Sequence, residues 1–257
     1  MKITVITPVY NGAATIRACM ESVLNQGYGD KEYVIVDGGS LDETVNIIKE
    51  CAHQPFVKWV SEKDNGLYDA FNKGILMATG DVVCFLCADD MYYHNHVLEN
   101  AVDAFRTHPE TDIVYGDIVY VDTNDLSKVT RYWKSSPFKP GLFKKGWLPP
   151  NTALFIKRSV FLRHGLFSLQ YRMAGDYEMQ YRFFESLRIK SFYISDIMVK
   201  MRSGGMSNSS LRNMYTSLRE CYYALKNNHV KFPMLYIVNT IFYRLKQLSI
   251  PKQLKKK

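Results

Sequence analysis

Two adjacent carboxylates, Asp89 and Asp90, follow an apolar run typical of a buried strand in the stretch Phe85–Tyr93, FLCADDMYY. Their negative charges repel each other unless a cation or hydrogen-bond donors offset the repulsion. Paired aspartates suit a hard divalent cation, because Mg²⁺ in proteins typically takes one or two carboxylates together with substrate phosphates. The pair therefore predicts a site for a divalent metal and a phosphate-bearing ligand.

Three other apolar runs that resemble strands also end in polar residues. In open α/β sheets, ligands bind beyond the carboxyl ends of the strands. Taken singly, each polar residue has an ordinary explanation as a turn or packing residue. Acids gathered from several strand ends nevertheless destabilise the fold unless a cation or a donor-rich ligand offsets their repulsion. The residues that we expect near the Asp89–Asp90 pair for this reason are Thr7, Pro8, Tyr10, Asn11, Asp37, Glu62 and Asp64.

Several common binding motifs are missing from the sequence. The first strand is not followed by G-x-G-x-x-G, and neither G-x-x-x-x-G-K-[ST] nor G-x-S-x-G occurs. A phosphate group must therefore be held through a metal ion rather than by a Gly-rich helix start. Cys84 and Cys87 form a single CxxC pair within a predicted strand, which indicates ordinary core residues rather than a zinc site.

The first half of the sequence alternates predicted strands with predicted helices. Ser40 and Glu43 have the spacing of a capping box, with Ser40 at the N-cap, and mark the start of one helix. Short strands separated by helices of about ten to fifteen residues indicate parallel βαβ units and an α/β fold. The predicted strands are Lys2–Tyr10, Glu32–Asp37, Phe56–Glu62 and Asp81–Ala88, and the predicted helices are Ala13–Asn25, Ser40–Cys51 and Asn65–Thr79.

The second half has a different pattern, with a small antiparallel element. Asp112–Asp122 and Val129–Lys134 resemble the two strands of a hairpin. From Asn208 the sequence is basic and predicted to be helical. The remaining predicted elements are a helix over His94–Arg106, a loop over Ser135–Pro150, a strand over Thr152–Lys157, a helix over Asp176–Ser186 and a strand over Lys190–Val199.

The composition predicts a folded protein with an uneven distribution of charge. The 257 residues are 47% hydrophobic, which is far too apolar for a disordered chain. The net charge is +8, but from Lys200 onward there are twelve Lys and Arg residues and one acid, Glu220. An anionic membrane or nucleic acid could bind such a tail. Five cysteines without a signal-like or membrane-spanning segment lead us to expect a cytoplasmic protein.

Five sequence motifs, in order and spacing, resemble those of the family 2 glycosyltransferases over roughly residues 1–205. The resemblance implies a GT-A (Rossmann-like) fold, with a mostly parallel central sheet flanked by helices. It also implies transfer of a sugar from a nucleotide donor with inversion at the anomeric carbon. The motifs are ITPVYN (Ile6–Asn11), VIVDGGSLDET (Val34–Thr44), SEKDNGLYDAFNKGI (Ser61–Ile75), TGDVVCFLCADDMYY (Thr79–Tyr93) and MAGDYEMQYR (Met173–Arg182).

The resemblance also implies roles for individual residues. Asp89 and Asp90 correspond to the family's metal-binding element, and Asp89 adjoins the donor as well. Mn²⁺ or Mg²⁺ is the implied cofactor. The residues implied around the nucleotide base and ribose are Thr7, Pro8, Tyr10 and Asp37, with Asn11 beside them, and those implied in the donor-side wall are Glu62, Asp64, Asn72 and Lys73.

Asp176 has two interpretations that are compatible with each other. An Asp at a helix start is a favourable cap, which alone would explain its presence. The resemblance makes it the catalytic base, which takes the proton of the acceptor hydroxyl as that oxygen attacks the sugar. The sequence departs from the family pattern where Cys87 replaces an acid before the aspartate pair and where Asn151 replaces a His. We expect Cys87 to be packed, because a thiol is a poor ligand for a hard cation.

The predicted protein is a cytoplasmic, metal-dependent inverting glycosyltransferase with a catalytic domain at residues 1–205 and a basic helical extension at 206–257. It would use a nucleoside-diphosphate sugar, with UDP favoured by Asp37 as an acceptor for a uracil N–H. The acceptor would be a glycan or a lipid-linked glycan of cell-surface polysaccharide synthesis. The segment Arg202–Asn208 has two interpretations, a lid over the donor or a linker.

Two alternatives for the activity and two for the tail stay open. A sugar-phosphate nucleotidyltransferase would have a related architecture, and a non-catalytic protein could bind a nucleotide sugar or nucleic acid, although nucleic acid is not the expected partner. The tail is either a helix packed on the catalytic domain or a peripheral contact with the inner, anionic face of the membrane.

Overall fold

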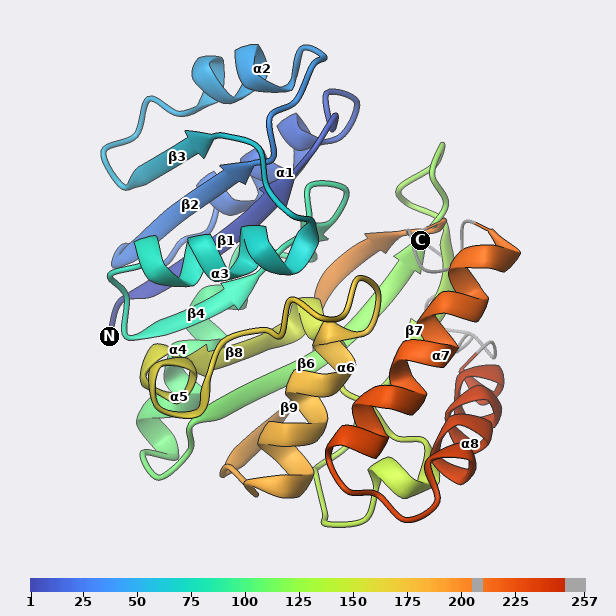
Figure 1. The fold of residues 1–257 in the computed structure, drawn as a ribbon. Helices are drawn as coiled ribbons and strands as arrows, with labels where there is room; N and C mark the ends of the chain where they lie inside the picture. The colour runs from blue at the N-terminus through green and yellow to red at the C-terminus, as the bar shows by residue number, and fades with distance from the viewer. Residues whose placement is uncertain (205–209, 248–257) are drawn as a thin grey trace.

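The computed structural model describes residues 1–204 and 210–247, which form a nine-stranded mixed sheet with helices packed on both faces (Figure 1). The strand order is β3-β2-β1-β4-β8-β6-β9-β5, and β7 pairs with β6 off this path. The strands are β1 (Ile3–Val9), β2 (Lys31–Asp37), β3 (Val57–Ser61), β4 (Val82–Phe85), β5 (Met91–Tyr92), β6 (Ile113–Val121), β7 (Val129–Trp133), β8 (Leu154–Lys157) and β9 (Ser191–Arg202).

The N-terminal half confirms the expected parallel βαβ units. Strand β1 pairs in parallel with both β2 and β4, and β2 pairs in parallel with β3. All seven residues of β1 are buried, because helices cover both faces of a parallel sheet. The connecting helices are α1 (Ile16–Leu24), α2 (Thr44–Cys51) and α3 (Leu67–Met77).

The predicted capping box before α2 is wrong. Helix α2 begins at Thr44, and Ser40 lies in the preceding loop, where its hydroxyl donates to Asp37 and accepts from the Asn11 N–H at 2.7 Å. Asp42 accepts a hydrogen bond from the Thr44 N–H at 3.1 Å instead. Ser40 therefore joins two strand-end loops rather than capping a helix.

Antiparallel strands enter the sheet after β4. Strand β8 pairs antiparallel with β4 and β6, and β6 and β7 form the predicted hairpin. Strand β9 pairs in parallel with β6 and antiparallel with β5. The helices of this half are α4 (Val97–Thr107), α5 (Arg158–His164), which the sequence analysis missed, and α6 (Gly175–Gln180), which continues as the π-helical segment η3 (Tyr181–Ser186).

The tail folds back onto the rest of the protein. Helix α7 (Leu211–Asn227) packs against α6 and α8 (Pro233–Lys246), and α8 packs against the short 3-10 helix η1 (Phe143–Lys145). Figure 1 shows α7 and α8 beside α6 and β7. A second 3-10 helix, η2 (Asn151–Ala153), precedes β8. Among the helices of the described residues, none is both long and apolar enough to cross a membrane. Most of the predicted lid, from residue 205 on, lies outside the described residues.

Candidate active site

A cavity of about 870 Å³ opens beyond the carboxyl ends of β1 and β4. One side of it, which we name the N-terminal wall, is formed by residues 8–12 and 87–90 together with Thr15, Asp64, Leu67, Tyr68, Ala70 and Phe71. The other side, the C-terminal wall, is formed by residues from the β6–β7 hairpin to α8. The sequence-predicted residues that line this cavity are Pro8, Tyr10, Asn11, Asp64, Asp89, Asp90 and Asp176.

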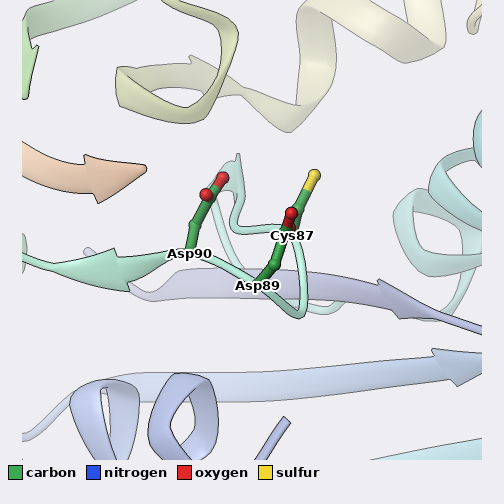
Figure 2. A group of neighbouring side chains, drawn as sticks. All are labelled: Cys87, Asp89 and Asp90. Atoms are coloured by element: carbon green, nitrogen blue, oxygen red, sulfur yellow. The ribbon is translucent and has the colours of Figure 1, made fainter. Parts of the chain in front are cut away.

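The aspartate pair lies in the turn between β4 and β5. The Asp90 N–H donates to the Cys87 carbonyl at 2.9 Å, and this turn directs the three side chains of Cys87, Asp89 and Asp90 to one side (Figure 2). One ligand atom from each of the three lies within 4.8 Å of the others. Asp89 is exposed, whereas Asp90 is 1% exposed. The geometry therefore supports one site shared by both carboxylates.

The electrostatics of Asp90 are those of a carboxylate that lacks its counter-charge. Burial and the neighbouring Asp89 raise its pKa well above the usual range, and Arg202 opposes this increase. Within the described residues, neither carboxylate oxygen has a hydrogen-bond partner of ordinary geometry. A buried, unpaired carboxylate is costly, so a divalent cation fits this position. Burial raises the pKa of Cys87 well above its usual value, which keeps the thiol protonated and a weak ligand.

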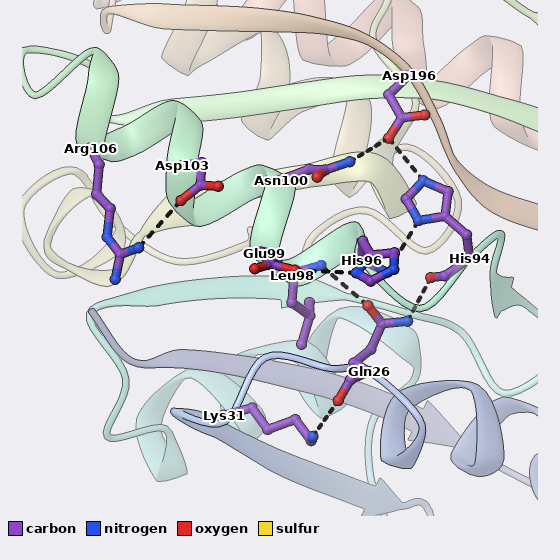
Figure 3. A network of polar contacts seen from close by, with 10 residues as sticks. All are labelled: Gln26, Lys31, His94, His96, Leu98, Glu99, Asn100, Asp103, Arg106 and Asp196. Carbon is purple, nitrogen blue, oxygen red and sulfur yellow. Dashed lines mark hydrogen bonds and ion pairs between the residues drawn. The ribbon is translucent and has the colours of Figure 1, made fainter.

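A polar network fixes the segment that follows Asp90 (Figure 3). A His94 ring nitrogen lies 2.9 Å from a carboxylate oxygen of Asp196, which also accepts from the Asn100 amide at 2.9 Å. The Gln26 side chain donates to the His94 carbonyl at 2.8 Å. These contacts join α1, α4 and β9 around β5, and so they hold the turn that carries the aspartates.

Asp176 faces the cavity from the first turn of α6. Its Oδ1 accepts from the Tyr68 hydroxyl at 3.0 Å and from the Tyr177 N–H at 2.8 Å. Burial and Asp176 raise the pKa of Tyr68 well above its usual value, so the phenol stays a donor. A Cβ at Gly175 would lie 2.8 Å from the Tyr68 ring, so only glycine permits this approach. A half-buried carboxylate fixed in this way is suited to accept a proton.

Thr7 and Asp37, which the sequence analysis expected around the nucleotide base, do not line the cavity. Thr7 is fully buried and bonds to the Tyr33 hydroxyl at 3.1 Å. Asp37 is fully buried and accepts from the N–H groups of Gly39 and Ser40 and from the hydroxyls of Ser40 and Ser61. Its carboxylate therefore holds the loop after β2, and the uracil contact expected of it stays a prediction.

Three residues expected in the donor-side wall lie behind it. Asn72 exchanges two hydrogen bonds of 2.9 Å with the backbone of Phe167. Lys73 pairs with Glu62 at 2.8 Å, and neither residue lines the cavity. Asp64 does line it, held by the Gly66 N–H at 2.9 Å. The sequence motif therefore combines residues that support the wall with residues that form it.

Sequence reasoning missed most of the C-terminal wall. The Arg131 guanidinium lies over the rings of both Tyr120 and Trp133, at 4.9 and 5.4 Å from their centroids. Gln180 approaches Asn151 at 3.5 Å. The apolar run of the tail was the one available signal, but it did not indicate which side chains reach the cavity. The tail residues that line it are Met214, Ser217, Leu218 and Ile241.

Comparisons with known proteins agree on one family. Residues 4–168 match the model of "Glycosyl transferase family 2". A PGL/p-HBAD biosynthesis glycosyltransferase of Mycobacterium bovis is 32% identical over 209 residues, which cover 80% of this chain and 79% of that protein.

Solved structures share the fold at lower sequence identity. The crystal structure of S. aureus TarS 1-349 in complex with UDP-GlcNAc has a TM-score of 0.70 at 18% identity, over 95% of this chain and 73% of that one. The mannosyltransferase PcManGT from Pyrobaculum calidifontis, in complex with GDP-Man and Mn²⁺, has a TM-score of 0.63 at 20% identity, over 99% of this chain and 67% of that one. These likenesses confirm the expected GT-A fold.

Proposed function

The chain belongs to glycosyl transferase family 2, and we propose that it transfers a sugar from a nucleoside-diphosphate sugar to a hydroxyl of a glycan or lipid-linked acceptor in cell-surface polysaccharide synthesis. One observation carries this proposal: the Asp89–Asp90 pair and Asp176 face the same cavity from opposite walls. An inverting displacement needs a charge-neutralising group at the diphosphate and a base at the acceptor. The cavity has a candidate for each.

Asp89 and Asp90 would hold a divalent ion, Mn²⁺ or Mg²⁺. The fit rests on the buried Asp90 carboxylate, whose oxygens lack hydrogen-bond partners of ordinary geometry in the described part of the chain. A bound divalent ion stabilises negative charge on the departing diphosphate. Cys87 would contribute little to this ligand set, because a thiol is a poor ligand for a hard cation.

Asp176 would act as the general base. The acceptor oxygen forms a bond to the anomeric carbon, the bond from that carbon to the diphosphate oxygen breaks, and the acceptor proton moves to the Asp176 carboxylate. Tyr68 and the Tyr177 N–H hold the carboxylate in place through Oδ1.

Tyr10, Asn11 and Asp64 would surround the nucleotide, with Pro8 beside them. Tyr10 is 59% exposed, which leaves its ring available to stack on a base. Asn11 joins the strand-end loops through the Leu41 N–H at 2.8 Å. A UDP-sugar is the proposed donor, in line with the neighbour that was solved with UDP-GlcNAc, and a GDP-sugar is the alternative, in line with the neighbour solved with GDP-Man.

The acceptor would lie against the C-terminal wall, which offers an apolar surface. Trp133, Met201 and Leu218 line this side of the cavity. The surface continues outside the cavity along α8, where large apolar side chains are exposed. These are Phe232, just before the helix, and Met234, Leu235, Val238, Ile241 and Phe242.

We also propose that this face of α8 contacts an anionic membrane on its cytoplasmic side. Exposed Lys139, Lys144 and Lys145 lie on the segment that packs against α8 or next to it, and Lys231 lies just before the helix. Apolar side chains bordered by lysines match an anionic lipid surface, to which each basic residue adds about 1 kcal/mol. A lipid-linked acceptor would then reach the cavity from the membrane.

The function is tested by screening nucleotide sugars for thermal stabilisation with and without Mn²⁺, followed by release of nucleoside diphosphate. The native donor raises the melting temperature by mass action and is turned over. Asp176→Asn should keep this stabilisation and lose turnover. Retained turnover would rule out Asp176 as the base, and stabilisation by none of the nucleotides would contradict the proposal.

The membrane contact is tested by co-sedimentation with phosphatidylglycerol and phosphatidylcholine vesicles. The native chain should bind the anionic vesicles, and a Phe232→Ser/Phe242→Ser variant should bind them less. Leu76→Ser is the matched control, because Leu76 is 60% exposed on α3, away from this face. Equal binding by all three proteins would defeat the membrane proposal.

A further inference from the structure

Helix α7 is tied to the loop that precedes α6 through one carboxylate. Glu220 Oε2 accepts from three consecutive backbone N–H groups, those of Arg172 at 3.0 Å, Met173 at 2.7 Å and Ala174 at 3.1 Å. Bonds from N–H groups to a carboxylate are roughly twice as strong as neutral ones. Glu220 is also the only acidic residue after Asp196 in the sequence.

The loop that Glu220 holds, residues 172–174, leads directly into the start of α6, the helix that carries Asp176. Ala174 is the N-cap of α6, and Asp176 lies in the first turn. Because Oδ1 of Asp176 bonds to the Tyr177 N–H at 2.8 Å, the direction of the carboxylate depends on the local backbone of that turn. A shift of the loop would therefore be transmitted to Asp176.

The same face of α7 makes two further contacts around this site. Asn227, seven residues after Glu220, donates to the Tyr171 hydroxyl at 2.9 Å. Ser217, three residues before it, lines the cavity. Residues three and seven apart lie on one face of a helix, so this face of α7 supports the loop at both ends and also forms part of the wall.

We infer that Glu220 is a positioning residue. Through it, the C-terminal extension fixes the orientation of the Asp176 carboxylate. This inference rests on the proposed role of Asp176 as the base. Displacing a reacting group by about 1 Å can cost about 100-fold in rate. The extension would then contribute to catalysis as well as forming two helices on the surface of the protein.

The chain offers a matched control in Glu185. Its carboxylate also accepts from backbone N–H groups, those of Gly141 at 2.9 and 3.0 Å and Phe143 at 3.1 Å. Neither Glu185 nor that loop lines the cavity. Glu185→Ala therefore removes a similar set of hydrogen bonds but leaves the loop before α6 and its bonds to Glu220 in place.

The experiment compares Glu220→Ala, Glu220→Gln and Glu185→Ala in the full chain. It uses the nucleotide sugar that the native chain turns over fastest, and hydrogen exchange reports on residues 170–178. Glu220→Ala should lower kcat about 10- to 100-fold with the donor KM within about 3-fold, because the base moves while the donor contacts stay. Glu220→Gln should recover most of kcat, since its carbonyl oxygen still accepts hydrogen bonds. Glu185→Ala should keep kcat within about 2-fold.

Two results would overturn the inference. The first is a Glu220→Ala variant whose kcat equals that of the native chain, although the amides of residues 172–174 exchange hydrogen faster than in the native chain. The second is a loss of kcat in Glu185→Ala as large as that in Glu220→Ala. If Glu220→Ala does not fold, Glu220→Asp replaces it: its shorter side chain should lower kcat, and native kcat there would overturn the inference. A native chain without any turnover refutes the proposed function, and the inference with it.

Discussion

The two walls of the cavity differ in how the chain builds them. The N-terminal wall comes from strand ends that adjoin in the sheet, β1 and β4, and from the start of α3. The C-terminal wall draws on the β6–β7 hairpin, the loop before β8, α6, the end of β9, α7 and α8. Short motifs therefore define the first wall, whereas the second exists only once distant segments pack together.

The chemistry of the walls differs in the same way. The N-terminal wall carries Asp64, Asp89 and Asp90, whereas much of the C-terminal wall is apolar or aromatic. We propose from this difference that the first wall serves the nucleotide and a metal and that the second wall selects the acceptor. Variants on the two sides should then affect different kinetic constants.

The largest expected effect is at the N-terminal wall, in Asp90→Asn. Loss of the carboxylate weakens the metal site, and because a metal is worth several kcal/mol at the diphosphate, kcat/KM should fall at least about 100-fold. Stabilisation by UDP with Mn²⁺ should disappear in thermal melts, as it should for the native chain in excess EDTA. An Asp90→Asn variant with native Mn²⁺-dependent turnover would contradict the proposed metal site.

Tyr68→Phe should have the next largest effect, at the junction of the two walls. It removes one donor to Asp176 and keeps the ring against Gly175. A hydrogen bond to a charged group is worth about 1.5–3 kcal/mol, so kcat should fall about 10- to 100-fold. The donor KM should not change, and steady-state kinetics would show this split. A change confined to the donor KM would instead place Tyr68 at the nucleotide.

Leu218→Ser tests the C-terminal wall alone. Leu218 is 36% exposed at the cavity, so the change removes part of an apolar surface without opening the core. The acceptor KM should rise about 3- to 10-fold, as expected for roughly 1 kcal/mol of lost contact, with the affinity for UDP and Mn²⁺ unchanged. A change in nucleotide affinity, measured by calorimetry, would show that the two walls do not bind separate substrates.

The smallest effect on activity should come from Glu32, which lies near the amino end of β2, at the opposite end of the sheet from the cavity. Glu32 is 1% exposed, and although burial alone would raise its pKa, hydrogen bonds from Lys58, Thr4 and Thr79 outweigh burial and lower the pKa to about 2. Its contribution to stability is therefore present above its ordinary pKa of 4.5 and is lost as the pH falls through about 2.

Glu32→Gln should accordingly lower the free energy of unfolding by about 2 kcal/mol at pH 7. The difference from the native chain should shrink as the pH falls from 5 toward 2, and kcat at pH 7 should stay near native. Urea titrations at several pH values measure this difference in the free energy of unfolding. A difference that is constant between pH 5 and pH 2 would show that Glu32 does not titrate as described.

Particular residues show how far the sequence reasoning reached. Tyr10, Asp64 and the aspartate pair line one cavity, because the carboxyl ends of neighbouring parallel strands meet at one edge, and their roles there stay predictions. Asp37 and Lys73 belong to the same motifs and yet support the wall from behind. Local sequence does not separate these roles, because a turn-forming acid and a ligand-binding acid have the same side chain.

The sequence by itself determined the βαβ framework, the family and the place of the acids at the ends of strands, because hydrophobic periodicity and motif spacing are local properties of the chain. Only the tertiary structure decided which carboxylates are already satisfied by hydrogen bonds, that Tyr68 reaches Asp176 across 108 positions, and that Glu220 of the tail holds the loop before α6. These facts depend on contacts between segments distant in sequence, and such contacts form only when the core brings those segments together.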